Sequence, residues 1–420
     1  MIKTEVKIDA LPDHVFKTFC HLPGAILLDS QRVSFSDRYS FIAWEPQETI
    51  KGDVRSTRKE DLFSFIDLWP RDYFVAGYIG YEVCQWIETL PNPGPKDVFN
   101  PHFYLAAYPK ILVFDNIRQT WYLWQREDMP NRFRLTLNRK IRSGEKGRLI
   151  GANQSKKYYI DRIKNVLDYI AAGEVYQINY TQRFYFTYSG DPFGLYLQLK
   201  KVQPVSFGAF LNLGDGYVVS GSPELFLRVK KGTVLTKPMK GTIKRSSKPT
   251  KDRRLRKRLK ESIKDRAENV MIVDLMRNDL GRFCRFGSVE VPRLFVVEAY
   301  STVYQMVSHV TGEVEKETTR SDIIRGVFPP GSITGAPKKR AMEIIYELEP
   351  NERGVYCGAI GYLWADQMVF NVAIRTVEIA NGKGVLGVGG GIVADSRPEL
   401  EYEESLLKAR ATFMALGIDL

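Results

Sequence analysis

Short strand-like runs and amphipathic helices alternate irregularly along this sequence, and that pattern most constrains the fold. Strand-like runs bounded by Pro, Gly, Asn and Asp fill the first 141 residues, with examples at 41–44, 74–81 and 110–114. Later strands such as 217–220 and 369–372 lie between helical segments. A regular parallel wind needs strict strand–helix alternation, so we expect a mixed α+β protein.

End signals place three helices. Ser155 can cap a helix that carries an apolar face from Ile160 to Ile170, with Gly173 as its end. Apolar residues four apart, from Leu255 to Ala267, predict a single amphipathic helix with its charges outside. Near the C-terminus, the segment 396–399 (SRPE) predicts a capping box, and Gly417 can close the helix that follows.

The positive charge of the chain is concentrated in one segment. The 420 residues hold 61 basic and 49 acidic side chains, a formal net charge of +12. Residues 244–266 alone hold twelve basic and three acidic ones. A basic chain suggests nucleic-acid binding as one alternative function. We find no nucleic-acid module or aromatic stacking platform, so we expect no nucleic-acid partner.

Other features exclude several classes of protein. The four cysteines are far apart and form no Cys-x-x-Cys pair, which argues against a disulfide framework or zinc cluster and favours the reducing cytoplasm. No uncharged apolar run approaches the roughly 18 residues of a membrane-spanning helix. The N-terminal segment has early acidic residues and no apolar core, unlike a secretory signal. We therefore expect a cytoplasmic protein without a membrane partner.

Two pairs of carboxylates recur at a spacing of three residues on predicted helices. Asp265 and Glu268 form one pair, and Glu401 and Glu404 form the other. This spacing places both members of a pair on one helix face. Carboxylates converging from two helices suit Mg²⁺, a hard cation that takes oxygen ligands. The alternative is that all four are solvated surface charges.

Two glycine-rich segments could bind an anion. Residues 387–391 (GVGGG) precede the C-terminal helix, and residues 331–338 (GSITGAPK) lead into another helix. Backbone N–H groups near a helix N-terminus can bind anions. With Arg375 and Lys408 nearby in sequence, these segments favour a small polyanionic substrate; the alternative is that they form tight turns only.

Lys240 lies between an apolar residue and a glycine in 238–242 (PMKGT). A lysine there could be desolvated and so become nucleophilic. The alternative is an ordinary exposed lysine.

Three long stretches carry a family resemblance. Residues 265–281, 331–338 and 389–404 resemble the chorismate-utilising enzymes, a group that includes anthranilate, aminodeoxychorismate, isochorismate and salicylate synthases. The similarity spans roughly 155–415, and 27–30, 39–42 and 77–82 look like the amino-terminal region of the first two members. The resemblance implies a layered α/β/β/α fold with two packed, mostly antiparallel sheets and helices outside. It also implies an N-terminal region 1–145 and a catalytic domain 150–420, divided near the polar segment 142–148.

Two positions discriminate among the members of this group. Gln177 stands where isochorismate and salicylate synthases carry a lysine that activates water, which points to ammonia as nucleophile. Lys240 stands where anthranilate-forming members have alanine and aminodeoxychorismate-forming members have lysine. The resemblance therefore favours amination of chorismate to aminodeoxychorismate, with anthranilate formation as the alternative.

The resemblance also implies roles for individual residues. Glu268 and Glu404 would bind Mg²⁺ directly, with Asp265 and Glu401 acting through water. Lys240 would attack C2 of chorismate, with Glu224 as general acid/base and Thr242 in the same catalytic motif. The residues implied to bind substrate are Thr334, Gly335, Tyr362, Arg375, Gly389, Gly390, Gly391 and Lys408. Ser30 falls in a motif that lines a tryptophan pocket in relatives.

One departure and one missing element refine these expectations. Gln305 replaces a histidine found in many relatives, and glutamine cannot exchange a proton usefully. This fits a synthase that stops at the amino adduct; the alternative is weakened activity. The sequence has no Gly-x-Cys-x-Gly glutaminase element, so we expect ammonia from a separate glutamine amidotransferase subunit. We also expect a separate aminodeoxychorismate lyase to complete 4-aminobenzoate formation.

Overall fold

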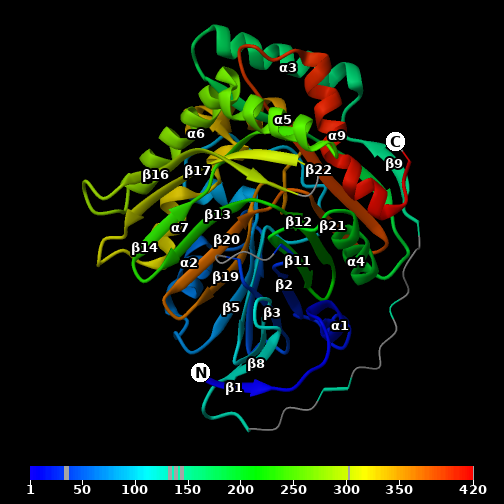
Figure 1. Ribbon diagram of the computed structural model, residues 1–420, viewed down its shortest axis with the longest axis vertical. Coiled ribbons are helices and arrows are strands. Elements are labelled where there is room, and N and C mark those ends of the chain that lie inside the picture. The colour runs from blue at the N-terminus through cyan, green and yellow to red at the C-terminus, as the bar shows by residue number, and fades with distance from the viewer. Residues whose placement is uncertain (33–36, 131–134, 137–140, 142–145, 301–302, 420) are drawn as a thin grey trace.

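The computed structural model describes residues 1–32, 37–130, 135–136, 141, 146–300 and 303–419. Two large antiparallel sheets pack face to face, and helices cover their outer sides (Figure 1). The expected α+β class and the layered α/β/β/α arrangement are confirmed. Among the described residues, no helix is long and apolar enough to cross a membrane.

The first sheet has twelve strands, and β9 pairs with β10 at its side. The strands follow the order β1, β8, β7, β3, β2, β11, β12, β21, β22, β10, β18. Their bounds are β1 Ile2–Val6, β2 Ile26–Asp29, β3 Tyr39–Ala43, β7 Lys110–Asp115, β8 Thr120–Gln125, β9 Arg148–Ala152, β10 Gln177–Thr187, β11 Phe207–Asn212, β12 Tyr217–Ser222, β18 Gly335–Ala336, β21 Thr376–Ala380 and β22 Lys383–Ile392.

The second sheet has ten strands in the order β15, β17, β14, β13, β20, β19, β5, β6, β4, with β16 paired to β17. Their bounds are β4 Glu48–Gly52, β5 Phe74–Ile79, β6 Phe103–Tyr108, β13 Leu225–Lys230, β14 Thr233–Thr236, β15 Met239–Lys244, β16 Glu290–Ala299, β17 Val303–Glu313, β19 Ala359–Trp364 and β20 Gln367–Val372.

Alternation along the strands divides the core into layers. On β3, Phe41 and Ala43 belong to the apolar cluster between the sheets, whereas Ile42 belongs to the cluster under the helices of the first sheet. On β5, Phe74 faces the inner cluster and Val75 the outer cluster of the second sheet. Because strand side chains alternate in direction, each buried sheet face has its own apolar set.

Helices cover both outer faces. Apolar residues of α1 (Pro12–Phe16), α4 (Pro192–Val202) and α9 (Pro398–Leu416) pack on the first sheet. Those of α2 (Lys59–Leu68), α6 (Ile263–Gly281) and α7 (Arg320–Val327) pack on the second. The other helical elements are α3 (Lys156–Ala171), α5 (Pro249–Glu261), α8 (Lys338–Leu348) and the 3₁₀ turns η1 (Tyr81–Trp86) and η2 (Gly331–Ile333).

The predicted helix ends have mixed outcomes. Ser155 caps α3 by accepting a hydrogen bond from the Tyr158 N–H, as predicted, and Gly417 closes α9 with φ of +66°. The capping box at the start of α9 is wrong, because the Ser396 hydroxyl instead donates to Glu401 at 2.6 Å. The prediction of a single basic helix is also wrong. The helical segment is interrupted at Ser262, which caps α6, and the Ile263 side chain is 86% exposed.

Both sequence regions contribute strands to both sheets. Strand β2 pairs with β11 in the first sheet, and β5 pairs with β19 in the second. The regions 1–145 and 150–420 therefore share one layered body. Most of the boundary segment between them, at 142–145, lies outside the described residues.

Candidate active site

The two sheets meet at Lys240, Gln177 and Gly391. A Cβ built on Gly391 of β22 would lie 2.9 Å from Lys240 Nζ and 3.1 Å from Gln177 Cδ. Lys240 belongs to the second sheet, whereas Gln177 and Gly391 belong to adjacent strands of the first. The structure therefore brings together Lys240 and Gly391, two of the predicted site residues, with Gln177 beside them.

A bulge in β15 presents Lys240 to this site. The register between β15 and β17 shifts between Lys240 and Thr242, and Gly241 between them has φ of +80°. A Cβ on Gly241 would lie 2.8 Å from the Asp265 carboxylate of α6, so only glycine fits there. Thr242 itself is exposed and pairs in register with Gln305 of β17.

Gln177 has an unsatisfied amide. The side chain is fully buried, yet neither its nitrogen nor its oxygen has a hydrogen-bond partner among the described residues. A buried amide normally finds partners, because leaving one unpaired costs about 1–3 kcal/mol. This side chain therefore has both a donor and an acceptor available beside Lys240.

Burial shifts the pKa of two groups toward the values that acid–base and nucleophilic chemistry require. It lowers the pKa of the Lys240 amine, although Glu268 and Glu224 oppose the shift. It raises the pKa of Glu224, which is 6% exposed, to about 7, with Lys240 and Arg375 opposing. A carboxyl group with this pKa can donate or accept a proton near neutral pH. Arg375 also belongs to this charged group, because Glu224 affects its pKa, which burial lowers.

The four predicted metal ligands come from α6 and α9. Burial raises the pKa of Glu268, and Asp265 and Glu401 add to this shift. Burial likewise raises the pKa of Glu401, with Glu404 adding to it. The carboxylates therefore act on one another across the two helices, which is the environment that a cation would relieve.

Gly390 and Lys408 connect these carboxylates to β22. A Cβ on Gly390 would lie 3.4 Å from Glu401 Oε2 and 3.8 Å from Glu404 Oε1. Lys408 pairs with Glu404 at 2.8 Å and donates to the Gly389 carbonyl at 2.9 Å. This ion pair lowers the pKa of Glu404 and keeps it ionised.

The acidic side chains of α6 and α9 can be compared with the usual coordination of Mg²⁺. In the part of the chain that the structure describes, no three acidic, histidine or cysteine side chains form a compact metal cluster. Mg²⁺ usually takes only one or two carboxylates and completes its shell with water and substrate oxygens. The acidic donors from α6 and α9 fit that pattern, and they do not fit a closed structural metal centre.

The segment 331–336 lies beside Gln177. Gly335 of β18 pairs with Ile178, and its φ of +154° and contact with the Gln177 carbonyl leave no room for a side chain. Thr334 is fully buried, and its hydroxyl donates within its own turn to the Pro330 and Gly331 carbonyls. That hydroxyl proton is therefore already used.

The glycine cluster at 387–391 is a strand and not a loop. These residues lie inside β22 and pair with β10. A Cβ built on Gly389 would lie 2.3 Å from the Tyr180 carbonyl oxygen. The alternative of tight turns at 387–391 is therefore wrong, because long-range pairing with β10 overrides the low strand propensity of glycine.

The structure places Tyr362 with Ser30 and not with Lys240. The Tyr362 ring packs 4.8 Å from Phe41 and 5.2 Å from Phe74, between centroids. Tyr362 and Ser30 both line a pocket of about 300 Å³ between the two sheets. Tyr362 therefore lies in this pocket, and its expected role in substrate binding stays a prediction.

Sequence reasoning missed Tyr356. Its ring lies against β22, where a Cβ on Gly387 would be 2.3 Å from the ring. Tyr356 is buried, and burial raises the pKa of its hydroxyl well above the usual range. The small residue at Gly387 could have signalled a large side chain opposite, but nothing in the sequence identified which one.

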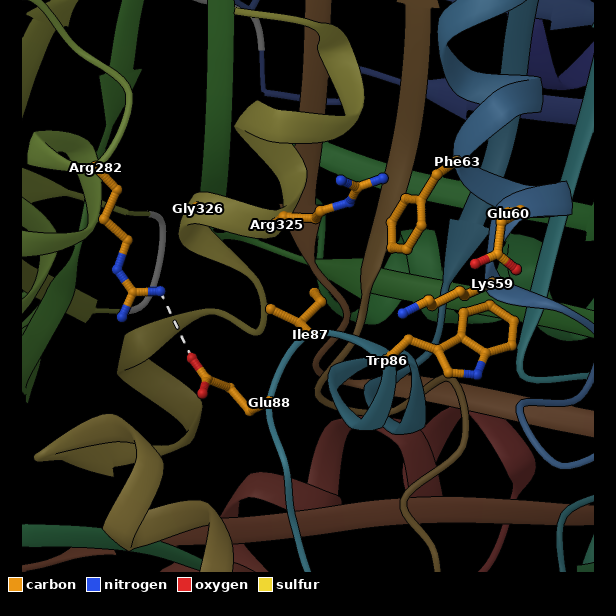
Figure 2. A pocket seen from close by; sticks show the side chains of 9 residues that line it. All are labelled: Lys59, Glu60, Phe63, Trp86, Ile87, Glu88, Arg282, Arg325 and Gly326. Atoms are coloured by element: carbon orange, nitrogen blue, oxygen red, sulfur yellow. Dashed lines mark ion pairs between the residues drawn. The ribbon is translucent and has the colours of Figure 1, made fainter.

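Another pocket, of about 500 Å³, lies elsewhere, between α2, η1 and the ends of α6 and α7 (Figure 2). Arg282 reaches Glu88 at 3.6 Å, and Arg325 stacks 4.2 Å from the centre of the Phe63 ring. Two of its cations are thus already engaged. This pocket shares no residue with the predicted site.

Comparison with known proteins agrees with this geometry. Residues 24–414 match the family model described as chorismate binding enzyme. Aminodeoxychorismate synthase component 1 of Escherichia coli K12 is 40% identical, over 94% of this chain and 93% of the relative. Anthranilate synthase component 1 of Pseudomonas aeruginosa is 37% identical, over 83% of this chain and 76% of the relative.

Solved structures show the same fold. The crystal structure of anthranilate synthase component I from Streptococcus pneumoniae superposes with a TM-score of 0.80 at 27% identity, covering 91% of this chain and 93% of that one. MenF, the menaquinone-specific isochorismate synthase of Escherichia coli, superposes with a TM-score of 0.78 at 16% identity, covering 99% and 94%, and supports the fold alone. The chain belongs to the chorismate-binding enzyme family and is a chorismate-utilising enzyme.

Proposed function

We propose that this enzyme converts chorismate and ammonia to 4-amino-4-deoxychorismate, the first step toward 4-aminobenzoate and folate. The observation that carries the proposal is the buried, unsatisfied amide of Gln177 beside Lys240. The amide oxygen can accept a hydrogen bond from an N–H of ammonia, and the amide N–H can donate to the ammonia lone pair. The identity with aminodeoxychorismate synthase component 1 over nearly the whole chain supports the same product.

In the proposed reaction, the neutral Lys240 amine forms a bond to C2 of chorismate. Both ring double bonds shift, from C1=C2 and C5=C6 to C1=C6 and C4=C5, as the C4 hydroxyl leaves as water with its proton supplied by Glu224. Ammonia then forms a bond to C4 and gives a proton to the Glu224 carboxylate, both double bonds shift back, and the C2–nitrogen bond breaks to release the neutral Lys240 amine. Two displacements give net retention, and the enolpyruvyl group stays attached. Lowered pKa of the lysine and raised pKa of the carboxyl support these roles.

We further propose Glu268 and Glu404 as Mg²⁺ ligands, with Asp265 and Glu401 acting through water. Bound Mg²⁺ would neutralise the ring carboxylate of chorismate and so favour loss of the hydroxyl. Arg375, Lys408 and the backbone of Gly335 and 389–391 are the groups proposed to hold the substrate. Ammonia would come from a separate glutamine amidotransferase subunit, and a separate lyase would release 4-aminobenzoate.

Product analysis tests this function. Chorismate, ammonium and Mg²⁺ are incubated with the enzyme, with and without an aminodeoxychorismate lyase, and separated by liquid chromatography. We expect aminodeoxychorismate alone and 4-aminobenzoate after the lyase is added. Fluorescent anthranilate as the main product would instead favour the second candidate, anthranilate synthase, which is supported by 37% identity. Gln305 of β17 is buried, and its Oε1 has no hydrogen-bond partner among the described residues; its amide would not serve as the proton donor or acceptor that pyruvate loss requires.

Substitution of Lys240 tests the covalent step. Lys240→Ala removes the nucleophile and should lower aminodeoxychorismate formation by more than about 100-fold. Lys244→Ala, at the exposed end of the same strand, is the matched control and should retain activity. Undiminished turnover in Lys240→Ala would contradict the covalent mechanism. It would not contradict the proposed product, aminodeoxychorismate.

The pocket around Ser30 is proposed to bind tryptophan. It joins apolar rings such as Phe41 and Tyr362 to charged groups including Asp29, Arg38 and Arg228. This combination suits an amino acid with an aromatic side chain. Calorimetric titration with tryptophan should show binding that Tyr362→Ala abolishes; heat that is equal in the variant would contradict the assignment.

A further inference from the structure

The guanidinium of Arg353 lies at the centre of a buried network behind the active site. Arg353, in the loop between α8 and β19, is 2% exposed. Its NH1 donates to the Ile333 carbonyl at 2.9 Å, and its NH2 donates to the Asn179 carbonyl at 2.6 Å. Ile333 immediately precedes Thr334, and Asn179 lies two residues after Gln177 on β10. One side chain thus binds both segments that border the reacting groups.

Glu349 holds this guanidinium in place. Its carboxylate accepts from Arg353 Nε at 2.9 Å and from NH2 at 2.6 Å, and also from the Thr181 N–H at 2.9 Å. The Asn179 N–H in turn donates to the Thr334 carbonyl at 2.7 Å. Beneath the guanidinium, the Tyr81 ring lies 4.5 Å away. The planar guanidinium can serve several fixed acceptors at once, which a lysine ammonium cannot.

The N-terminal region fixes the network from the other side. Glu82 of η1 is fully buried. Its carboxylate accepts hydrogen bonds from the backbone N–H of Arg353 at 2.6 Å and from the backbone N–H of Gly354 at 2.9 Å. Two residues further along, Tyr356 packs against β22. Glu82 therefore sets the position of the loop that carries both Arg353 and Tyr356.

We propose that Arg353 is a positioning residue that holds the Thr334 turn and the Gln177 strand in register with each other, and that Glu82 of the N-terminal region holds Arg353. This inference rests on the proposed function, because it assumes that Gln177 and the 331–336 segment bind the reactants. Among the described residues, Arg353 forms no hydrogen bond or ion pair with Lys240 or with the carboxylates of α6 and α9. Its effect passes through the two backbone carbonyls.

Three variants test this role. Arg353→Lys keeps the charge but cannot bond Ile333, Asn179 and Glu349 together. Glu82→Gln keeps one acceptor for the loop and replaces the other with a donor facing an N–H. Arg320→Lys is the matched control, because Arg320 also bonds two backbone carbonyls, those of Trp69 and Ala365, away from the site. Each variant is assayed well below its thermal midpoint, with folding checked by near-ultraviolet circular dichroism.

The readout is the Michaelis constant of each reactant. Loss of folded protein alone lowers kcat and leaves every KM unchanged, whereas displaced binding segments raise KM. In Arg353→Lys we expect KM for ammonia and for chorismate to rise about tenfold or more. The Mg²⁺ activation constant should stay at the wild-type value, and Glu82→Gln should show a smaller rise of the same kind. Arg320→Lys should keep all three constants.

Unchanged KM values in Arg353→Lys, or an equal rise in Arg320→Lys, would overturn the proposal. If Arg353→Lys does not fold, Glu82→Gln decides: unchanged KM values there would reject the positioning role. Failure of the proposed product would be seen separately in the wild-type product assay. In that event, calorimetric affinity for chorismate in the same variants replaces the kinetic readout.

Discussion

At the residue scale, the site combines groups whose ordinary properties are altered by burial. Glu224 and Lys240 are the clearest pair, since burial raises the pKa of the carboxyl and lowers the pKa of the amine. Both shifts disfavour the charged forms, because burial removes the solvation of the carboxylate and of the ammonium group. That combination supports a lysine nucleophile with a carboxylic acid as proton donor.

Glu224 should control the alkaline side of the pH profile. With a pKa of about 7, the carboxyl is protonated below pH 7 and loses its proton above it. Because the proposed acid must carry a proton, kcat/KM for chorismate at fixed free ammonia should fall as pH rises through about 7. Glu224→Gln should lower activity and remove this fall.

The matched control is Glu378→Gln. Burial also raises the pKa of Glu378 to about 7, yet Glu378 lies on β21 and accepts a hydrogen bond from the Val355 N–H. Its substitution should leave the shape of the pH profile unchanged. A profile that keeps its descending limb in Glu224→Gln would show that another group is the acid.

At the element scale, strand β22 depends on the absence of side chains. Its glycines let β15 and α9 approach, so that Lys240 and the acidic residues Glu401 and Glu404 can reach one surface. In an ordinary strand glycine lowers the strand propensity and weakens packing. Here glycine is needed because a side chain would prevent the close approach.

Gly391→Ala should therefore disable the site without unfolding the sheet. The new Cβ would lie 2.9 Å from Lys240 Nζ and 3.1 Å from Gln177 Cδ, which displaces one or both side chains. We expect kcat/KM to fall about 100-fold, measured as aminodeoxychorismate formation. Gly151→Ala on β9, where nothing lies within 4 Å of the new Cβ, should keep wild-type activity. Equal activity in both variants would contradict the close packing at Gly391.

At the scale of the whole molecule, the two sequence regions form one body. The N-terminal strands form one end of each sheet, where β2 and β5 lie next to the catalytic-region strands β11 and β19 (Figure 1). The Glu82 carboxylate adds a direct connection to the loop behind the site. The N-terminal region is thus part of the framework that positions the catalytic groups.

A fragment of residues 146–420 should fail to fold alone. Removing β2 and β5 would expose the edges of β11 and β19, which are largely buried strands. We expect the fragment to aggregate or to lack near-ultraviolet circular dichroism, and co-expression with residues 1–145 to restore chorismate turnover. A monomeric, native-like fragment would show that the catalytic region is an independent domain.

The basic segment shows how composition and structure answer different questions. Its net charge suggested a nucleic-acid partner, but α5 is a short exposed helix whose Leu259 packs into a small apolar cluster with Val297, Tyr304 and Met306. It adjoins α6, which carries Asp265 and Glu268. Because α5 is exposed and adjoins α6, its positive charge lies on the outer side of the site.

The sequence by itself determined the class of fold, the family and the types of residue in the site. Long local motifs such as 265–281 and periodicity such as that of α3 are readable because neighbouring residues specify them. Lys240, Gln177 and the paired acids of α6 and α9 could be predicted for the same reason.

Only the tertiary structure decided which distant residues meet. It placed Tyr362 beside Ser30, brought Tyr356 to Gly387, made the glycine cluster part of a strand inside the first sheet, and joined Glu82 to Arg353. Each of these depends on pairing between segments far apart in the chain, where the free energy of packing and of buried hydrogen bonds overrides local preference. Spacing along the sequence carries no information about such partners.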